Sequence, residues 1–195
     1  MDDGKIRIGG ICGSLRGGSY NLMLLRAAAE LMPADALYEE IAIHDLPLYN
    51  PDLDGPAPPE AVRALRSRVQ AVDGLLFAVP EYNYSMTGAL KNALDWASRP
   101  VPESGLHGKP AAVMGASQGS FGSVRAQLHF RHVAVFTNMH LLNKPEVLVR
   151  DPQAKFTPDG RLADEDTRKV LGQLVEELVR WTRILRGGRA ALSLR

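Results

Sequence analysis

The sequence predicts an α/β fold in which a five-stranded parallel sheet carries helices on both faces. Apolar strand patterns alternate with helix patterns along the chain, and this alternation produces right-handed crossovers between parallel strands. Two of the strands, 75–79 and 111–114, are apolar without interruption, as expected for strands that are covered on both sides. The length of 195 residues suits one domain with an ordinary hydrophobic core.

The first half of the chain begins with a strand over 6–11 and a helix over 20–32. A weaker second strand, 36–43, leads into a proline-rich stretch over 46–58, and loops of that length are usually functional or mobile. Pro59 suits the first turn of the next helix. The apolar face of that helix consists of Val62, Leu65, Val69 and Val72.

The second half begins with the strand 75–79, which we expect to end at Pro80 because proline has no N–H for a central ladder. Apolar residues then recur at helical spacing from Leu90. The remaining predicted elements are the strand 111–114, a helix over 121–138, a strand over 146–149 and a helix over 164–185. Five strands favour the flavodoxin-like order 2-1-3-4-5. We expect one flavodoxin-like domain over 1–186 and a frayed tail over 187–195.

Composition excludes several function classes. The net charge of +1 gives no electrostatic footprint for nucleic acid. The single cysteine, Cys12, excludes an internal disulfide framework and fits a reducing compartment. We find no signal peptide and no apolar run of the ~20 residues needed to span a bilayer. We therefore predict a cytoplasmic protein with neither a membrane nor a nucleic acid as partner.

The loop after the first strand, residues 13–21, predicts a phosphate site. It joins a strand to a helix N-terminus, where free N–H groups and the positive end of the dipole attract anions. Ser14 and Ser19 add hydroxyl groups, and Arg16 adds a guanidinium. The spacings typical of triphosphate and dinucleotide loops are both absent, which favours a mononucleotide. The alternative is an ordinary glycine-rich turn with a serine cap.

Two further loops follow strands of the same sheet. Glu81, Tyr82 and Asn83 come directly after the third strand, and residues 115–127 follow the fourth. In open α/β sheets, ligands bind at the carboxyl ends of the strands, so we expect the three loops to converge on one rim. Gly115 and Gly119 would let a flat ring approach the backbone.

These motifs resemble the NADPH-dependent FMN reductase family, which includes bacterial chromate, quinone and azo-dye reductases. The resemblance covers roughly residues 5–149. It rests on the segments 13–16 with Ser19 and Asn21, 80–83 with 90–96, and 117–119 with 125–127, and residues 46–50 also resemble that family's loop after the second strand. Thr87 departs from the pattern, because proline is common there in the family, and we expect this change to loosen its loop.

The resemblance implies a bound FMN, NADPH or NADH as co-substrate, and no metal. It assigns the FMN phosphate to Ser14, Arg16, Ser19, Tyr20 and Asn21. It assigns the isoalloxazine ring to Pro80, Glu81, Tyr82 and Asn83, with Ser117 near the far edge of the ring. No side chain is expected to act as a catalytic nucleophile or base, because the flavin carries the chemistry.

The function that the resemblance implies is an NAD(P)H oxidoreductase. Hydride would pass from nicotinamide to N5 of FMN, and two electrons would then pass to quinone, azo, chromate-type or free-flavin acceptors. The family is typically dimeric or tetrameric, and Tyr49 and Asn50 could line a neighbour's site. We expect Glu81 to orient its loop through its backbone or an arginine. Two alternatives stay open: a flavodoxin-like electron carrier that does not oxidise nicotinamide, and a flavin-binding regulatory or scaffold protein.

Three other features have simpler interpretations. Cys12 is more readily a small buried hydrophobe than a redox thiol. His129 and His132 lie at i, i+3 without a third ligand, which favours a surface or interface role over a metal site. The helix over 121–138 is apolar on more than one face, so it is either a deep core helix or a subunit contact.

Overall fold

A computed structural model of the chain describes residues 4–101 and 103–193, and the side chains among them up to residue 188. Its main sheet has the order β2-β1-β3-β6, with β7 and β8 both paired to the outer edge of β6, and every pairing is parallel. The flavodoxin-like α/β fold and the predicted order are thus confirmed. The strands are β1 (Ile6–Cys12), β2 (Ala36–Glu40), β3 (Gly74–Ala78), β6 (Pro110–Ser117), β7 (His140–Leu141) and β8 (Val147–Arg150).

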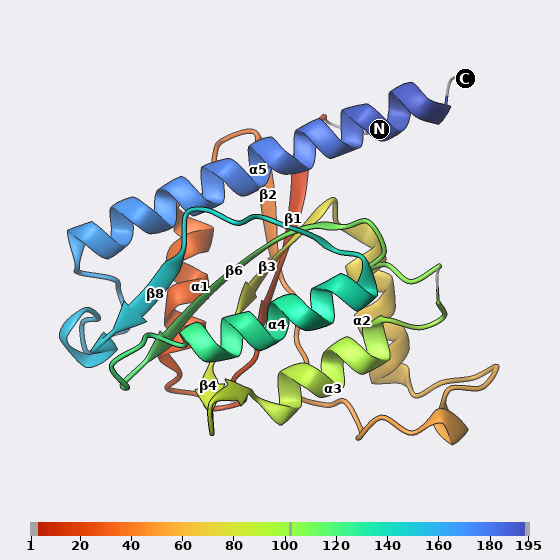
Figure 1. The fold of residues 1–195 in the computed structure, drawn as a ribbon, viewed down its shortest axis with the longest axis horizontal. Helices are drawn as coiled ribbons and strands as arrows, with labels where there is room; N and C mark the ends of the chain where they lie inside the picture. The colour runs from red at the N-terminus through yellow and green to blue at the C-terminus, as the bar shows by residue number, and fades with distance from the viewer. Residues whose placement is uncertain (1–3, 102, 194–195) are drawn as a thin grey trace.

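Helices cover both faces of this sheet (Figure 1). Helices α1 (Tyr20–Glu30) and α5 (Glu165–Ser193) pack on one face. Helices α2 (Glu60–Ala71), α3 (Gly88–Ala97) and α4 (Val124–Thr137) pack on the other. The core between the sheet and helices α2, α3 and α4 contains the bulkiest fully buried side chains, Trp96, Phe77 and Phe130. Every residue of β3 is buried, which explains its unbroken apolar sequence.

The register of the strands brings their carboxyl ends together. Cys12 of β1 pairs with Ala78 of β3, and Ala78 pairs with Met114 of β6. The segments at the ends of these strands therefore lie at one rim: the first loop (residues 13–19), the segment from residue 79 to α3, and the third loop, defined as the last two residues of β6 and the turn that follows (residues 116–123).

Two details differ from the prediction. The predicted strand over 146–149 is present as β8, shifted by one residue, whereas β7, which pairs with the same edge of β6, has no counterpart among the predicted strands. The last helix does not end at residue 185 but continues through Gly187 and Gly188 to Ser193. Glycine lowers helix propensity without forbidding a helix. Residues 194 and 195 of the predicted tail lie outside the described part of the chain.

The proline-rich stretch after β2 is attached to α3 by hydrogen bonds. The carbonyl of Pro47 accepts from the indole of Trp96 and from the amide of Asn92, both at 2.8 Å. Tyr49 donates its N–H to Asn92 at 2.7 Å and packs edge-on against Trp96. Asn50 caps a 3-10 turn (Pro51–Leu53). Of the two sequence alternatives, function or mobility, these bonds argue against a mobile loop.

Among the described helices, none has the combination of length and apolar sequence that crossing a bilayer requires.

Candidate functional site

A cleft of about 450 Å³ lies at the rim where the three segments meet. Nine of the ten predicted site residues line it, and only Asn83 does not. Sequence reasoning did not include Ala116, Gln118 and Gly119 among the site residues, although Gln118 and Gly119 belong to the motif around Ser117. Ala116 has no functional side chain and could be found only from the structure. The full lining is Ser14, Arg16, Ser19, Tyr20, Asn21, Pro80, Glu81, Tyr82, Ala116, Ser117, Gln118 and Gly119.

The first loop places a cation and hydroxyl groups at the N-terminus of α1. The Ser19 hydroxyl oxygen accepts from the N–H groups of Asn21 (3.2 Å) and Leu22 (3.4 Å), so Ser19 is the helix cap. The guanidinium of Arg16 is exposed and lies 5.8 Å from the ring centre of Tyr20. The Ser14 hydroxyl accepts from the Arg16 N–H at 3.3 Å. This end of the cleft is suited to an anion.

Cys12 is the last residue of β1 and directly precedes the first loop. Its side chain is buried, and this burial raises the pKa of the thiol, although hydrogen bonds from the Ser14 N–H and the Ser19 hydroxyl partly oppose the rise. A thiol with a raised pKa is a poor nucleophile at neutral pH. Cys12 therefore serves the loop as a small buried group and a weak acceptor.

Asn21, in the first turn of α1, joins the start of that helix to the third loop. Its side-chain amide donates to the carbonyl of Ala116 and its amide oxygen accepts from the N–H of Ala116, both at 2.9 Å. The residue as a whole is only 5% exposed. Both ends of the amide are thus committed to protein backbone, so Asn21 shapes the cleft through this pair of bonds.

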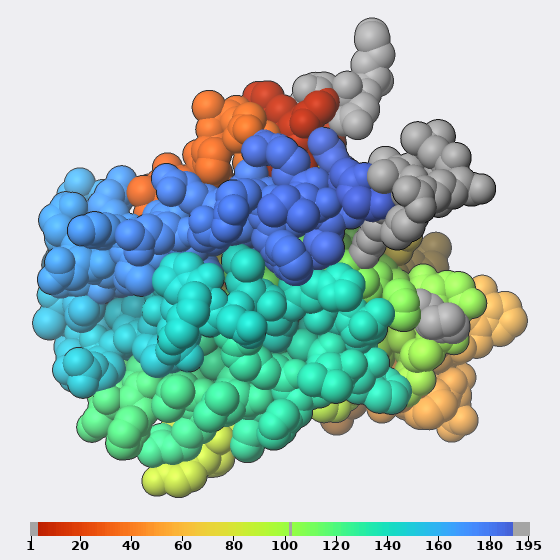
Figure 2. Space-filling model, turned by 45° about the horizontal axis from the view of Figure 1, so that its top comes forward, coloured from red at the N-terminus to blue at the C-terminus, as the bar shows by residue number. Residues whose placement is uncertain are grey.

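The segment after β3 forms a short hairpin, β4 (Glu81–Tyr82) and β5 (Ser85–Met86), at the other end of the cleft. Asn83 and Tyr84 form its turn with φ values of 50° and 66°, the pattern of a type I′ turn. Positive φ is uncommon for a bulky residue such as tyrosine. Tyr82 is exposed and lines the cleft. Asn83 is also exposed, but it does not line the cleft. In Figure 2 the hairpin (yellow-green) projects at the edge of the surface beside the third loop (green).

Glu81 holds this hairpin against α4. Its carboxylate accepts from the guanidinium of Arg125 at 2.8 Å and from the N–H groups of Arg125 (3.0 Å) and Ala126 (3.3 Å). Ser123 makes no side-chain cap for α4, so Glu81 supplies the cap from another element. The expected role of Glu81, orienting its loop through an arginine, is confirmed.

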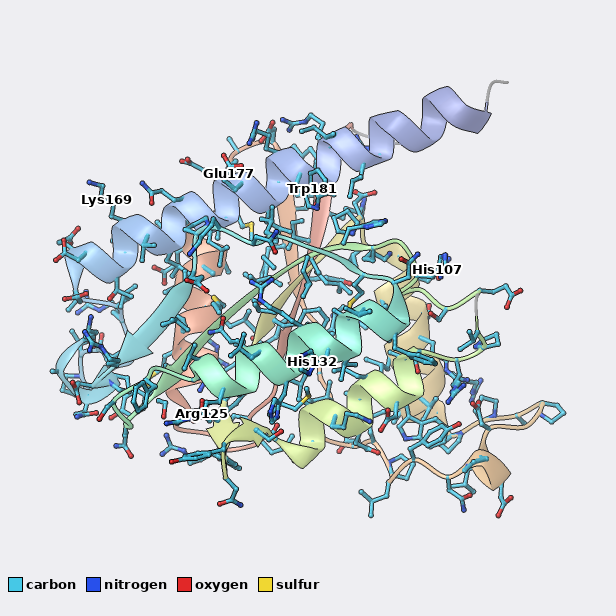
Figure 3. The ribbon with its side chains drawn as sticks, in the orientation of Figure 1. His107, Arg125, His132, Lys169, Glu177 and Trp181 are labelled. Carbon is cyan, nitrogen blue, oxygen red and sulfur yellow. The ribbon has the colours of Figure 1, made fainter. Side chains whose placement is uncertain are left out.

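The Arg125 guanidinium also contacts two aromatic rings. It lies 3.9 Å from the ring centre of Tyr84 and 4.4 Å from that of Phe121. Figure 3 shows Arg125 at the start of α4, next to the hairpin. His129, one turn further along α4, is hydrogen-bonded to Ser85 at 2.9 Å. The hairpin is therefore attached to α4 by a partly exposed cluster of charged and aromatic side chains.

The predicted role of Gly115 is wrong. A side chain there would overlap the Ser123 hydroxyl and would meet the Val79 carbonyl at 2.6 Å, so the missing side chain makes room for Ser123 and not for a ligand ring. The expectation that Thr87 loosens its loop is wrong as well. Its hydroxyl caps α3 and donates to the carbonyl of Gly13 at 2.6 Å.

The residues present fit an FMN molecule. The cleft volume lies within the range of about 300–1,000 Å³ that is common for small-molecule sites. One end offers the guanidinium of Arg16 with hydroxyl groups for a phosphate, and the other offers Tyr82 and strand backbone for a flat ring. Among the residues that line the cleft, Glu81 carries the only carboxylate, and that carboxylate is bonded to Arg125 and the N-terminus of α4.

Comparison with known proteins identifies the family. Residues 6–153 match the family described as NADPH-dependent FMN reductase. The chain is 50% identical over 182 residues to an NAD(P)H-dependent FMN reductase of Pseudomonas aeruginosa, covering 93% of this chain and 98% of that protein. It is 41% identical to a 2-hydroxy-1,4-benzoquinone reductase from a Burkholderia species, over 91% of this chain and 97% of that protein.

A solved structure of a similar flavoenzyme supports the same family. The chain matches FerB, a flavoenzyme NAD(P)H:(acceptor) oxidoreductase from Paracoccus denitrificans, with a TM-score of 0.84 and 35% identity, over 91% of this chain and 97% of that one. The predictions of an oxidoreductase that uses FMN and a nicotinamide are confirmed at the level of the family. The chain belongs to the NADPH-dependent FMN reductase family.

Proposed function

We propose that this protein is an NAD(P)H-dependent FMN enzyme that reduces quinones and related two-electron acceptors. The observation that carries the proposal is the cleft, which has an anion-binding end at α1 and an aromatic end at the hairpin. When bound, FMN supplies an N5 atom that takes hydride from nicotinamide and passes two electrons on.

In this proposal the residues of the chain bind FMN and orient its phosphate and its ring. Arg16 and the Ser14 hydroxyl would neutralise and hydrogen-bond the phosphate, helped by the positive end of the α1 dipole. Ser19 and Tyr20 would complete that end, with Asn21 holding it to the third loop. Ser19 would act through its cap, because its side chain is only 3% exposed.

The ring would lie between the hairpin and the third loop. Pro80, Glu81 and Tyr82 would support one side of it and Ser117 the far edge, and Asn83 would act only through the shape of the turn. Backbone N–H groups of these segments are preorganised dipoles, which can stabilise negative charge as it develops on a ring. The exposed side of Tyr82 leaves room for nicotinamide and acceptor to bind in turn.

Quinones are the acceptors that we favour. The support comes from relatives named 2-hydroxy-1,4-benzoquinone reductase and, in Solanum tuberosum, NAD(P)H:quinone oxidoreductase. Azo dyes, chromate-type oxyanions and free flavin are further proposed acceptors, because an open site discriminates weakly among acceptors of different shape.

A homodimer or homotetramer is proposed from the surface of α4. Four large apolar side chains on and just before this helix are more than half exposed: Phe121, Leu128, Val135 and Phe136. A patch of this kind marks an interaction site more often than a monomer surface. Size-exclusion chromatography with light scattering should give a dimer or tetramer at micromolar concentration, and a monomer would contradict this part of the proposal.

We further propose that residues 1–186 form a single FMN-binding domain that works in the cytoplasm. The support for one domain is that both cores share the same sheet. The support for a reducing compartment is the free, buried Cys12.

Anaerobic absorbance spectroscopy tests the function. The purified protein, loaded with FMN, should lose the visible absorbance of oxidised flavin when NADPH is added. It should regain this absorbance when 1,4-benzoquinone is then added. Reduction by dithionite but not by NADPH or NADH would contradict the proposal and favour the electron carrier. Reduction by NADPH without reoxidation by any quinone would contradict the proposed acceptor class.

A further inference from the structure

Thr87 connects two parts of the cleft that are far apart in sequence. It precedes α3, and the residue is only 4% exposed. The hydroxyl oxygen accepts from the N–H of Leu90 at 3.2 Å, as in an ordinary helix cap. The hydroxyl proton, which a cap does not need, is donated to the carbonyl of Gly13 at 2.6 Å.

Gly13 is held tightly at this point. Its N–H donates to the carbonyl of Ala78 at 2.9 Å, which extends the pairing of β1 with β3 by one residue. A side chain at Gly13 would meet Pro80 at 2.8 Å and Leu90 at 3.0 Å. The first loop therefore begins in direct contact with the segment that carries the hairpin and α3.

The bond from Thr87 fixes one peptide plane. The carbonyl of Gly13 and the N–H of Ser14 belong to the same planar unit and point in opposite directions. The carbonyl of Gly13 accepts from Thr87, and the N–H of Gly13 donates to the carbonyl of Ala78. With both backbone groups of Gly13 bonded, the peptide that leads into Ser14 has a fixed direction, and the Ser14 side chain lines the cleft and accepts from the Arg16 N–H.

We propose that Thr87 is a positioning residue for the phosphate end of the cleft, acting through the Gly13–Ser14 peptide. This inference rests on the proposed function, because it takes FMN as the ligand. Loss of the hydroxyl leaves the Gly13 carbonyl without this donor and lets the Ser14 and Arg16 side chains leave the positions that suit a phosphate. A ligand with no phosphate does not depend on those positions.

The test compares FMN with riboflavin, which has the same ring and no phosphate. The dissociation constants of both are measured by quenching of flavin fluorescence for the wild type, Thr87→Val and Thr87→Ser. Thr137→Val is the matched control, because Thr137 is also buried but bonds only within its own helix. Thermal unfolding, followed by circular dichroism, checks that each variant is folded.

We expect Thr87→Val to weaken FMN binding about tenfold and to leave riboflavin binding within about twofold, where tenfold corresponds to about 1.4 kcal/mol. Thr87→Ser, which keeps the hydroxyl, should restore FMN affinity, and Thr137→Val should change neither ligand. Equal weakening of FMN and riboflavin by Thr87→Val would overturn the proposal and leave Thr87 a helix cap. Unchanged FMN affinity would overturn it as well. Wild-type protein that binds no FMN would contradict the proposed function itself, which is a different result from either.

Discussion

The first loop and the hairpin form opposite ends of one cleft, yet the chain holds them in different ways. The first loop and the start of α1 are held by two buried side chains, Thr87 and Asn21, whose partners are backbone groups of neighbouring segments. The hairpin is held by Glu81 and Arg125, with two exposed aromatic rings around the guanidinium. Buried bonds to backbone leave little freedom, whereas a partly exposed cluster can rearrange at small cost.

The difference matches the proposed task of each end. A phosphate is bound once and retained, which favours a rigid site. Nicotinamide and acceptor must enter and leave past the ring, which favours a less strongly held edge. Breaking each contact in turn tests this comparison.

Asn21→Ala should have the largest effect. It leaves the buried N–H and carbonyl of Ala116 without partners, and each unsatisfied buried group costs about 1–3 kcal/mol. We expect the free energy of unfolding in urea to fall by about 3 kcal/mol. The control is Asn143→Ala, an exposed asparagine, which should change it by less than about 0.5 kcal/mol. Equal effects of the two variants would show that the bond between the loops is not structural.

Glu81→Ala should have the next largest effect. The Glu81 side chain is 9% exposed, and its carboxylate accepts from one guanidinium and two backbone N–H groups. Hydrogen bonds to a charged group contribute about 1.5–3 kcal/mol, so we expect a loss of about 2 kcal/mol and a lower melting temperature. Glu81→Gln keeps an acceptor, so its loss of stability, measured by differential scanning calorimetry, should be about half that of Glu81→Ala. A wild-type melting temperature for Glu81→Ala would mean that the hairpin does not depend on this bond.

Arg16→Ala addresses ligand binding at the first loop. The side chain is exposed and makes no ion pair among the described residues, so stability should hardly change. Loss of its charge should weaken FMN binding about tenfold, as measured by isothermal titration calorimetry. Arg26→Ala, which removes the same charge from the outer side of α1, is the control. If both variants bind FMN equally well, Arg16 does not contact the phosphate.

Arg125→Lys should have the smallest effect. Lysine keeps a charge near Glu81 but loses the planar contact with Tyr84 and Phe121, which contributes about 0.5–1 kcal/mol at an exposed site. We expect stability to fall by less than about 1 kcal/mol and hydrogen exchange to rise in residues 81–86 alone. Faster exchange in the first loop as well would show that the two ends are coupled.

The sequence was enough to predict the strand order and most of the cleft. Uninterrupted apolar strands and helical spacing are local signals, and a rim of strand ends follows from the parallel order. It was not enough for contacts between distant segments. No sequence pattern around Gly115 indicates that its missing side chain makes room for Ser123. None around Thr87 indicates that its hydroxyl donates to Gly13. The extra turns of α5 are not predicted because residues 187–195 show no apolar periodicity, whereas the helix continues to Ser193.

The most direct test of the two-ended cleft is a crystal structure of the protein with FMN. Our account predicts the phosphate within hydrogen-bond distance of Arg16 and Ser14, and the isoalloxazine ring between Tyr82 and the third loop. A ring at the first loop with the phosphate at the hairpin, or FMN bound outside this cleft, would contradict it.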